Sequence, residues 1–348
     1  MAETNEKQPG KRKGCGFGCA ALIAAVLCIV GFFCLIILMG IGSLMKGKSR
    51  FLWDSENASA QFGKDEMPEM KEIWSSGNGD VKVVRIPLTG MILLNNDSPF
   101  HTGTADQTLR AIRRATHDKD VKGLLLEIDS GGGGVTASDI LYQAVKTFKA
   151  EEEGRFVVAI MGDVAASGAY YVALAADRIL AHPTTITGSI GVIMQSYNVK
   201  ALAEKLGVSD VTLKSGKNKD LLNMFQDVNE EQKAIVQKVI DASYDRFVSL
   251  VVENRNIPKE KVLPLADGRI FSAVDAVEKQ LIDGIGYFDD ARRALAKLLK
   301  EEDVEVYRYE EEASLMDFLS GSGIGFSSNI HQLLQDQEPR LMYRMDLR

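Results

Sequence analysis

Short apolar runs alternate with amphipathic segments through the middle of this 348-residue chain, and glycine-rich turns join them. Apolar runs with the length of strands lie at residues 81–88, 121–128, 156–161 and 190–199. Apolar side chains at helical spacing predict helices at residues 104–116, 137–148, 165–176, 201–206, 230–253, 258–265, 273–279 and 289–299. Strands and helices that alternate across short turns form parallel βαβ units. The sequence therefore predicts an α/β domain over residues 81–300.

A membrane anchor is predicted ahead of this domain. Residues 14–45 contain no charged side chain, and a helix needs about 20 apolar residues to cross the hydrocarbon core. Four Lys or Arg residues precede the run and three follow it, which favours a cytoplasmic tail at residues 1–13 and an extracytoplasmic domain. A cleavable signal peptide ending near Ala58-Ser59-Ala60 is the alternative, but that site lies well beyond the apolar run. We expect an uncleaved, single-pass anchor in the cell membrane.

The remaining segments and the charge narrow the classes of function. Residues 46–80 are polar with little periodicity, which predicts a stalk, and residues 301–348 form a C-terminal extension. The chain beyond residue 50 carries 34 basic and 46 acidic residues, which argues against a nucleic-acid partner. The four cysteines lie in or beside the anchor and form no spaced cluster with histidines, so neither a metal nor a cofactor is expected.

Three stretches carry residues suited to catalysis. Residues 129–135 (DSGGGGV) follow a strand and open a helix, where parallel sheets bind ligands and where glycines let backbone N–H groups approach a substrate. Ser167 lies at the next such junction among small residues that leave its hydroxyl unshielded. Residues 213–220 (LKSGKNKD) hold three lysines. Taken singly, the three are also compatible with an ordinary turn, a helix-packing serine and a solvated basic patch.

Together the three stretches offer an oxyanion hole, a nucleophile and a base. None of the four histidines lies in a loop that resembles one bearing a base, so a Ser–Lys dyad fits better than a Ser–His–Asp triad. A lysine base must be neutral, so its pKa must fall by about 2–3 units through desolvation. The spacing leaves Lys214, Lys217 and Lys219 open as candidates.

The chain resembles bacterial signal peptide peptidase A, the S49 serine peptidases, in their short single-domain form. The resemblance covers roughly residues 81–299 and rests on five motifs in the family's order: DSGGGGV (129–135), GDVAASGAYY (162–171), TGSIGV (187–192), KSGKNKD (214–220) and DGRIFSAVDAVEKQLID (267–283). It implies a crotonase/Clp-like superhelix of βαβ units, preceded by one transmembrane helix.

The resemblance also implies roles for individual residues. Ser167 would be the nucleophile, Lys219 the general base and Ser189 the hydroxyl that positions the lysine amine. The backbone N–H groups of Gly133 and Gly168 would form the oxyanion hole. A homo-oligomer in which neighbouring protomers share the dyad is implied as well.

Two positions depart from the family's pattern. The family usually has proline where Gly131 stands, and the glycine of this chain is expected to loosen the oxyanion turn. It usually has glycine where Ala169 stands, and the added methyl group of this chain is expected to narrow the pocket behind the nucleophile.

We therefore expect a membrane-embedded serine endopeptidase that degrades residual signal peptides or other membrane-derived peptides. The alternatives are a crotonase-type acyl-CoA hydrolase or isomerase, which leaves the lysine loop unexplained, and a catalytically idle membrane scaffold. Residues 339–348 carry more apolar side chains than a disordered end usually does. We expect this tail to dock, either on the surface of its own or a neighbouring domain or as an extended strand in a substrate groove.

Overall fold

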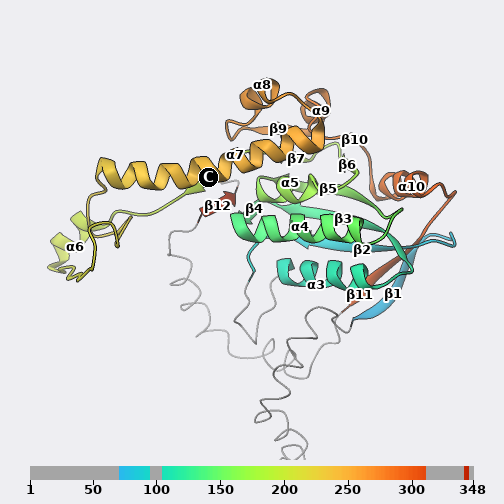
Figure 1. Ribbon diagram of the computed structural model, residues 1–348, viewed down its shortest axis with the longest axis horizontal. Coiled ribbons are helices and arrows are strands. Elements are labelled where there is room, and N and C mark those ends of the chain that lie inside the picture. The colour runs from blue at the N-terminus through green and yellow to red at the C-terminus, as the bar shows by residue number, and fades with distance from the viewer. Residues whose placement is uncertain (1–69, 95–103, 311–340, 345–348) are drawn as a thin grey trace, which may run out of the picture. The chain divides into compact units, whose positions relative to one another are not determined.

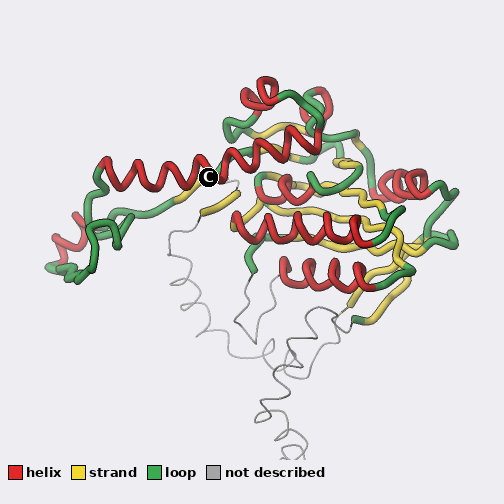
Figure 2. The backbone as a smooth tube through the Cα atoms, viewed as in Figure 1, coloured by secondary structure: helices red, strands yellow, loops and turns green. Residues whose placement is uncertain are grey.

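The computed structural model describes residues 70–94, 104–310 and 341–344. Within these ranges a nine-stranded sheet has the order β1-β11-β2-β3-β5-β6-β10, with β7 beside β5 and β9 beside β7 (Figures 1 and 2). Its strands are β1 (Lys71–Ser76), β2 (Lys82–Thr89), β3 (Val121–Ser130), β5 (Phe156–Ala166), β6 (Arg178–Ala181), β7 (Ile186–Gly188), β9 (Ile270–Ser272), β10 (Gly284–Ile285) and β11 (Glu305–Glu310).

The centre of the sheet is parallel. Strand β3 runs parallel to both β2 and β5. Strands β6 and β7 run parallel to β5, β10 runs parallel to β6, and β11 runs parallel to β2. Only β1 against β11 and β9 against β7 pair in the antiparallel sense within this sheet. The predicted α/β architecture of parallel βαβ units is thus confirmed.

Helices cover both faces of the sheet. Helices α3 (Thr104–His117) and α4 (Val135–Glu151) pack side by side, and α10 (Phe288–Leu299) packs against β3 and β5 (Figure 1). Successive residues of a strand point to opposite faces, so Val84 lies in the larger hydrophobic cluster and Val83 in the cluster around α10. Both are fully buried, as expected for a strand covered on both sides.

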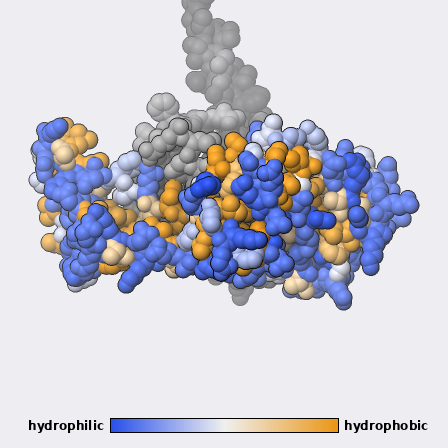
Figure 3. All heavy atoms as spheres, turned by 90° about the horizontal axis from the view of Figure 1, so that it is seen from above, coloured by the Kyte–Doolittle hydropathy of each residue, from blue (hydrophilic) through white to orange (hydrophobic). Residues whose placement is uncertain are grey.

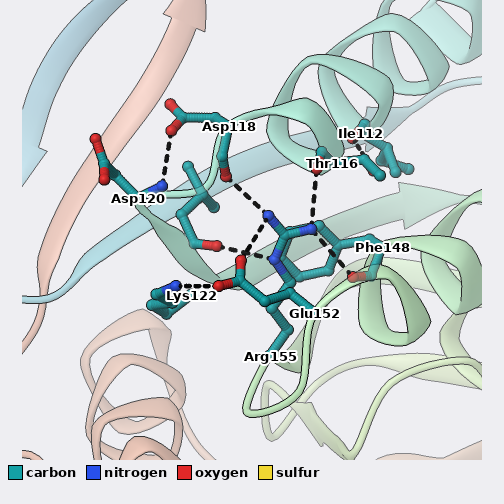
Figure 4. A network of polar contacts seen from close by, with 9 residues as sticks. Ile112, Thr116, Asp118, Asp120, Lys122, Phe148, Glu152 and Arg155 are labelled. Carbon is teal, nitrogen blue, oxygen red and sulfur yellow. Dashed lines mark hydrogen bonds and ion pairs between the residues drawn. The ribbon is translucent and has the colours of Figure 1, made fainter.

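Arg155 fastens the ends of three elements on the side of α3 and α4 (Figure 4). Its side chain is almost fully buried and lies over the Phe148 ring. The guanidinium donates hydrogen bonds of 2.8–3.3 Å to four backbone carbonyl oxygens, those of Thr116, Asp118, Val121 and Phe148. Because a helix leaves its last carbonyls without intrahelical partners, one cation here satisfies acceptors at the ends of both α3 and α4.

Helix α7 (Glu230–Arg255) is longer than the sheet beside it. It begins at Asn229, whose side chain accepts from the backbone N–H of Gln232 in a capping box. Its C-terminal half packs on the domain through Phe247 and Val251, whereas its first half extends away from the sheet (Figures 1 and 2). We call residues 200–240, which include α6 (Lys200–Leu206) at the far end, the arm.

Smaller elements surround the end of the sheet at which β3 and β5 finish. They are α5 (Gly168–Ala173), α8 (Lys259–Val262), the 3₁₀ turn η1 (Leu263–Leu265) and α9 (Ala273–Glu278). A second sheet has three antiparallel strands in the order β4 (Gly132–Gly134), β12 (Leu341–Arg344) and β8 (Ile193–Met194).

Several predicted boundaries are wrong. The helix expected at residues 165–176 is confined to α5, because β5 continues to Ala166 through pairing with β3 and β7. The strand expected at 190–199 is reduced to β8, and the helix expected at 258–265 is divided at Pro264, since proline disfavours a helical residue before it.

The sheet is also wider than residues 81–300. Strand β1 comes from the segment expected to be a stalk, and β11 comes from the expected C-terminal extension. No helix within the described ranges is long and apolar enough to span a membrane, and the predicted anchor at residues 14–45 lies outside them.

Candidate active site

Ser167 lies on a sharp turn between β5 and α5. Its backbone has φ 55° and ψ −118°, a conformation that non-glycine residues adopt at a cost of about 1–3 kcal/mol. The Ser167 N–H donates to the carbonyl oxygen of Gly188 at 2.8 Å, and the Ser167 carbonyl accepts from Tyr171 N–H at 2.9 Å. The turn is therefore held from β7 on one side and from the first turn of α5 on the other. A strained strand-to-helix turn is also how nucleophilic serines are presented in α/β-hydrolases.

The hydroxyl of Ser167 is buried and makes no hydrogen bond within the described part of the chain. The residue as a whole is 1% exposed. Burying a hydroxyl without a partner costs about 1–3 kcal/mol, so such a group in a native site calls for a functional explanation. An oxygen that must be free to attack a substrate provides one.

The glycine strand β4 lies beside this turn, and two of its glycines cannot readily be replaced by other residues. Gly132 has φ +97°, which favours glycine. A Cβ on Gly133 would lie 2.1 Å from the backbone oxygen of Ile92, which is too close for any side chain. The Ser130 hydroxyl accepts from Gly132 N–H at 3.0 Å. The Asp129 carboxylate accepts from Val164 N–H at 3.0 Å and so pins this turn to the end of β5.

Ser189 follows β7 directly and is 8% exposed, with φ 51°. Its N–H donates to the carbonyl oxygen of Arg269 at 2.8 Å, and Gly268 N–H donates to Ile190 at 3.1 Å. Hydrogen bonds from Arg269 lower the pKa of the Asp267 carboxyl to about 2, so Asp267 is ionised at neutral pH. Because Gly188 accepts from Ser167 and precedes Ser189, the two serines are neighbours through the backbone.

A cavity of about 850 Å³ opens beside Ser189. Residues 191–193 form one wall, α7 contributes Gln237, Ile240, Asp241 and Tyr244, and the turn at residues 266–270 closes the far side. The cavity thus lies between the base of the arm and the turn that holds Ser189, with space for a side chain from another molecule.

The three candidate lysines all lie in the arm, but their surroundings differ. Lys214 pairs with Asp220 at 2.7 Å and Lys217 with Glu231 at 2.7 Å, and each ammonium lowers the pKa of its carboxylate partner. Lys219 is exposed, and in the described part of the chain no hydrogen bond or ion pair engages its side chain. Figure 1 shows α6 and the segment after it at the end of the arm remote from α5. Ser167 and Lys219 of one chain are therefore not brought together.

The strand β12 occupies the space between β4 and β8. Tyr343 is opposite Gly133, and Met342 is opposite both Gly134 and Ile193, in antiparallel registers. This strand also contacts α5. A segment of the C-terminal extension thus lies as the middle strand across the glycines that precede α4 and the helix that follows Ser167.

The sequence singled out Ser167, Ser189, Gly133 and Gly168, and the fold gathers their backbones around the ends of β5 and β7. It gave no role to Ile92, and Asp129 and residues 267–269 appeared only as parts of the motifs DSGGGGV and DGRIFSAVDAVEKQLID, without a role of their own. The methyl group of Ala169 lies in the hydrophobic core, so the expected narrowing of the pocket has no support.

The chain is similar in sequence to several known proteins. Residues 149–302 match peptidase family S49. A protein of Enterococcus faecium named for signal peptide peptidase SppA is 35% identical over 82% of this chain and 84% of its own length. The chloroplastic serine protease SPPA of Arabidopsis thaliana is 34% identical over 74% of this chain and 38% of its own, and protease 4 of Salmonella typhi is 31% identical over 68% and 38%.

Among solved structures, a ClpP1 mutant from Listeria monocytogenes has a TM-score of 0.39 and 17% identity, covering 61% of this chain and 94% of its own. The Clp-like superhelix therefore stays a prediction.

Proposed function

The chain belongs to peptidase family S49, and from that premise we propose that it is a membrane-anchored serine endopeptidase with a Ser/Lys dyad. Its substrates are residual signal peptides or other membrane-derived peptides. The observation that carries the proposal is the strained, buried Ser167 whose hydroxyl has no partner among the described residues, set beside a strand in which Gly132 needs a positive φ and Gly133 leaves no room for a side chain. The uncharged run at residues 14–45 supports the anchor, which would place the peptidase where such peptides accumulate.

The proposed chemistry assigns one task to each group. Ser167 Oγ attacks the carbonyl carbon of the scissile peptide bond while the Lys219 amine accepts the hydroxyl proton. The N–H groups of Gly133 and Gly168 donate to the oxyanion that develops on the former carbonyl oxygen. The lysine then protonates the leaving amine, and water activated by the same amine hydrolyses the acyl-enzyme. Ser189 accepts or donates one hydrogen bond that orients the amine.

We propose that the lysine comes from a neighbouring protomer. The position of the arm away from α5 supports this, as does the cavity beside Ser189. The arm also exposes apolar side chains that a monomer would not favour, namely Leu202, Leu206, Val208, Val211 and Leu213. Figure 3 shows hydrophobic residues interspersed with hydrophilic ones over the surface of the molecule. A head-to-tail contact in which each arm docks on the next protomer would bury them and repeat around a ring.

The C-terminal segment is proposed to act as a tethered competitor. Its strand β12 pairs on both sides with strands that flank the site, which is how an extended peptide adds to exposed strand edges. A substrate peptide would displace β12 and take the same antiparallel register against β4. The tail would therefore slow cleavage of weak substrates and yield to strong ones.

Subunit complementation tests the shared dyad. Ser167→Ala and Lys219→Ala should each leave less than about a hundredth of wild-type activity on a quenched fluorescent peptide in detergent. Co-expression of the two variants should restore activity, because about a quarter of the contacts in a randomly mixed ring join an intact serine to an intact lysine.

The control is co-expression of Ser167→Ala with the double variant Ser167→Ala/Lys219→Ala, which should stay inactive. An intact mixed oligomer without activity would refute the shared dyad. Residual activity of Ser167→Ala above that hundredth, or its labelling by a fluorophosphonate, would refute the nucleophile and with it the proposed function.

A further inference from the structure

Tyr171 links the two halves of the site. It lies one turn beyond Ser167 on α5 and is fully buried, and its hydroxyl donates a hydrogen bond to Asp139 on α4. Asp139 in turn lies one turn beyond Gly134, where β4 ends and α4 begins. This hydrogen bond therefore joins the helix that follows Ser167 to the helix that follows the glycine strand.

The surroundings of this bond fix its geometry. The Tyr171 ring meets Tyr142 edge to face at 5.5 Å and lies against Phe247 of α7 at 5.1 Å. The Arg246 guanidinium approaches the same Asp139 oxygen at 3.5 Å. The ring is thus confined by α4 and α7, and the hydroxyl is aimed at one carboxylate.

The adjacent Tyr170 is equally buried, but it ties α5 to a different part of the fold. Its hydroxyl donates at 2.8 Å to the carbonyl oxygen of Leu281, which lies after α9. Because α5 has only six residues, small movements of this helix would shift Ser167 relative to β4. The bond from Tyr170 restrains α5 against the segment after α9, whereas the bond from Tyr171 to Asp139 restrains it against α4, which begins where β4 ends.

We propose that Tyr171 and Asp139 are positioning residues that hold the Ser167 hydroxyl in register with the N–H groups of β4. The inference rests on the proposed function, since it assigns the pair a task in that reaction. Misplacement of catalytic groups by a fraction of an ångström lowers turnover without weakening the binding of a peptide whose backbone pairs with β4 and β8. The pair thus contributes to kcat rather than to KM.

The test uses Tyr171→Phe in the full-length protein, with Tyr170→Phe as the matched control. Each variant loses one hydroxyl from the same helix and keeps its ring. Tyr171→Phe should lower kcat and the rate of Ser167 labelling by a fluorophosphonate by about tenfold at an unchanged KM. Tyr170→Phe should lower the thermal midpoint at least as much and leave both rates within about twofold.

A double-mutant cycle separates positioning from general weakening. Asp139→Asn retains an oxygen acceptor and should keep most of the labelling rate, whereas Asp139→Ala should lose as much as Tyr171→Phe. The double variant Tyr171→Phe/Asp139→Ala should be no worse than either single variant, because the two residues act through one bond.

Three outcomes would overturn the proposal. The first is an equal loss of labelling in Tyr170→Phe and Tyr171→Phe, and the second is an additive loss in the double variant. The third is labelling of Tyr171→Phe at the wild-type rate; if Ser167→Ala is then not labelled, the positioning role fails while the peptidase assignment stands. If Ser167→Ala is still labelled, the assignment itself fails.

Discussion

Both serines of the candidate site have a positive backbone φ, and each donates its backbone N–H to a residue that is distant in the sequence. Ser167 donates to the carbonyl oxygen of Gly188, and Ser189 donates to that of Arg269. The sequence predicted Ser167 from the small residues around it, because those are visible in a short window. It could not predict either torsion, nor the approach of Ile92 that makes Gly133 irreplaceable, since these depend on tertiary contacts.

The three lysines of the arm can be distinguished at the same scale. Lys214→Ala and Lys217→Ala should retain at least about half of the wild-type kcat, because each removes an amine already engaged by a carboxylate. Lys219→Arg should be as inactive as Lys219→Ala, since a guanidinium cannot give up its proton near neutral pH. Steady-state kinetics on one peptide would measure all four.

Activity of the wild type should also rise with pH as the lysine base loses its proton, and a flat profile between about pH 6 and 10 would count against a lysine. An inactive Lys214 or Lys217 variant beside an active Lys219→Ala would reassign the base.

At the scale of elements, the best predicted segments were those whose side chains repeat with a clear period. Strands β2 and β3 and helices α3 and α4 lie where the apolar pattern placed them. Strands β1 and β11 were missed because both are largely half-exposed, so neither shows an alternation of apolar and polar residues. They stabilise each other by pairing across almost the whole domain, and no local window contains that information.

Arg155 gives a stability prediction for these elements. Arg155→Met keeps much of the side chain's volume but leaves four buried or partly buried carbonyl groups without this donor, and should cost about 2–4 kcal/mol of unfolding free energy. Arg293→Met, which removes an exposed i,i+3 ion pair with Asp290 on α10, should cost less than about 1 kcal/mol. Urea unfolding of the two variants measures the difference. Equal midpoints would show that the buried cation adds no more stability than a surface pair.

For the whole molecule, the tail was anticipated as a docking segment from its apolar side chains. Its place between β4 and β8 could not be anticipated, because β8 is only two residues long and gave no strand signal of its own. Pairing between strands so far apart in the sequence depends on the assembled domain and cannot be read from any one segment.

Deletion of residues 339–348 tests the competitor role of this tail. The apparent KM for a short peptide should fall about twofold or more, because a tethered segment at millimolar effective concentration competes even when it binds weakly. Deletion of residues 345–348 alone is the control, since it leaves β12 in place and should leave KM unchanged. A truncation to residue 338 that keeps the wild-type KM with its oligomer intact would leave the tail with a packing role only.

The gap that β12 fills is one strand wide, with backbone partners waiting on both sides. Whatever enters it has to arrive as a single extended thread with its own N–H and C=O groups unpaired. A helix must unravel first, and a folded domain cannot enter at all. Under the proposed function, such a site selects peptides by the unpaired state of their backbone, before any side chain is recognised.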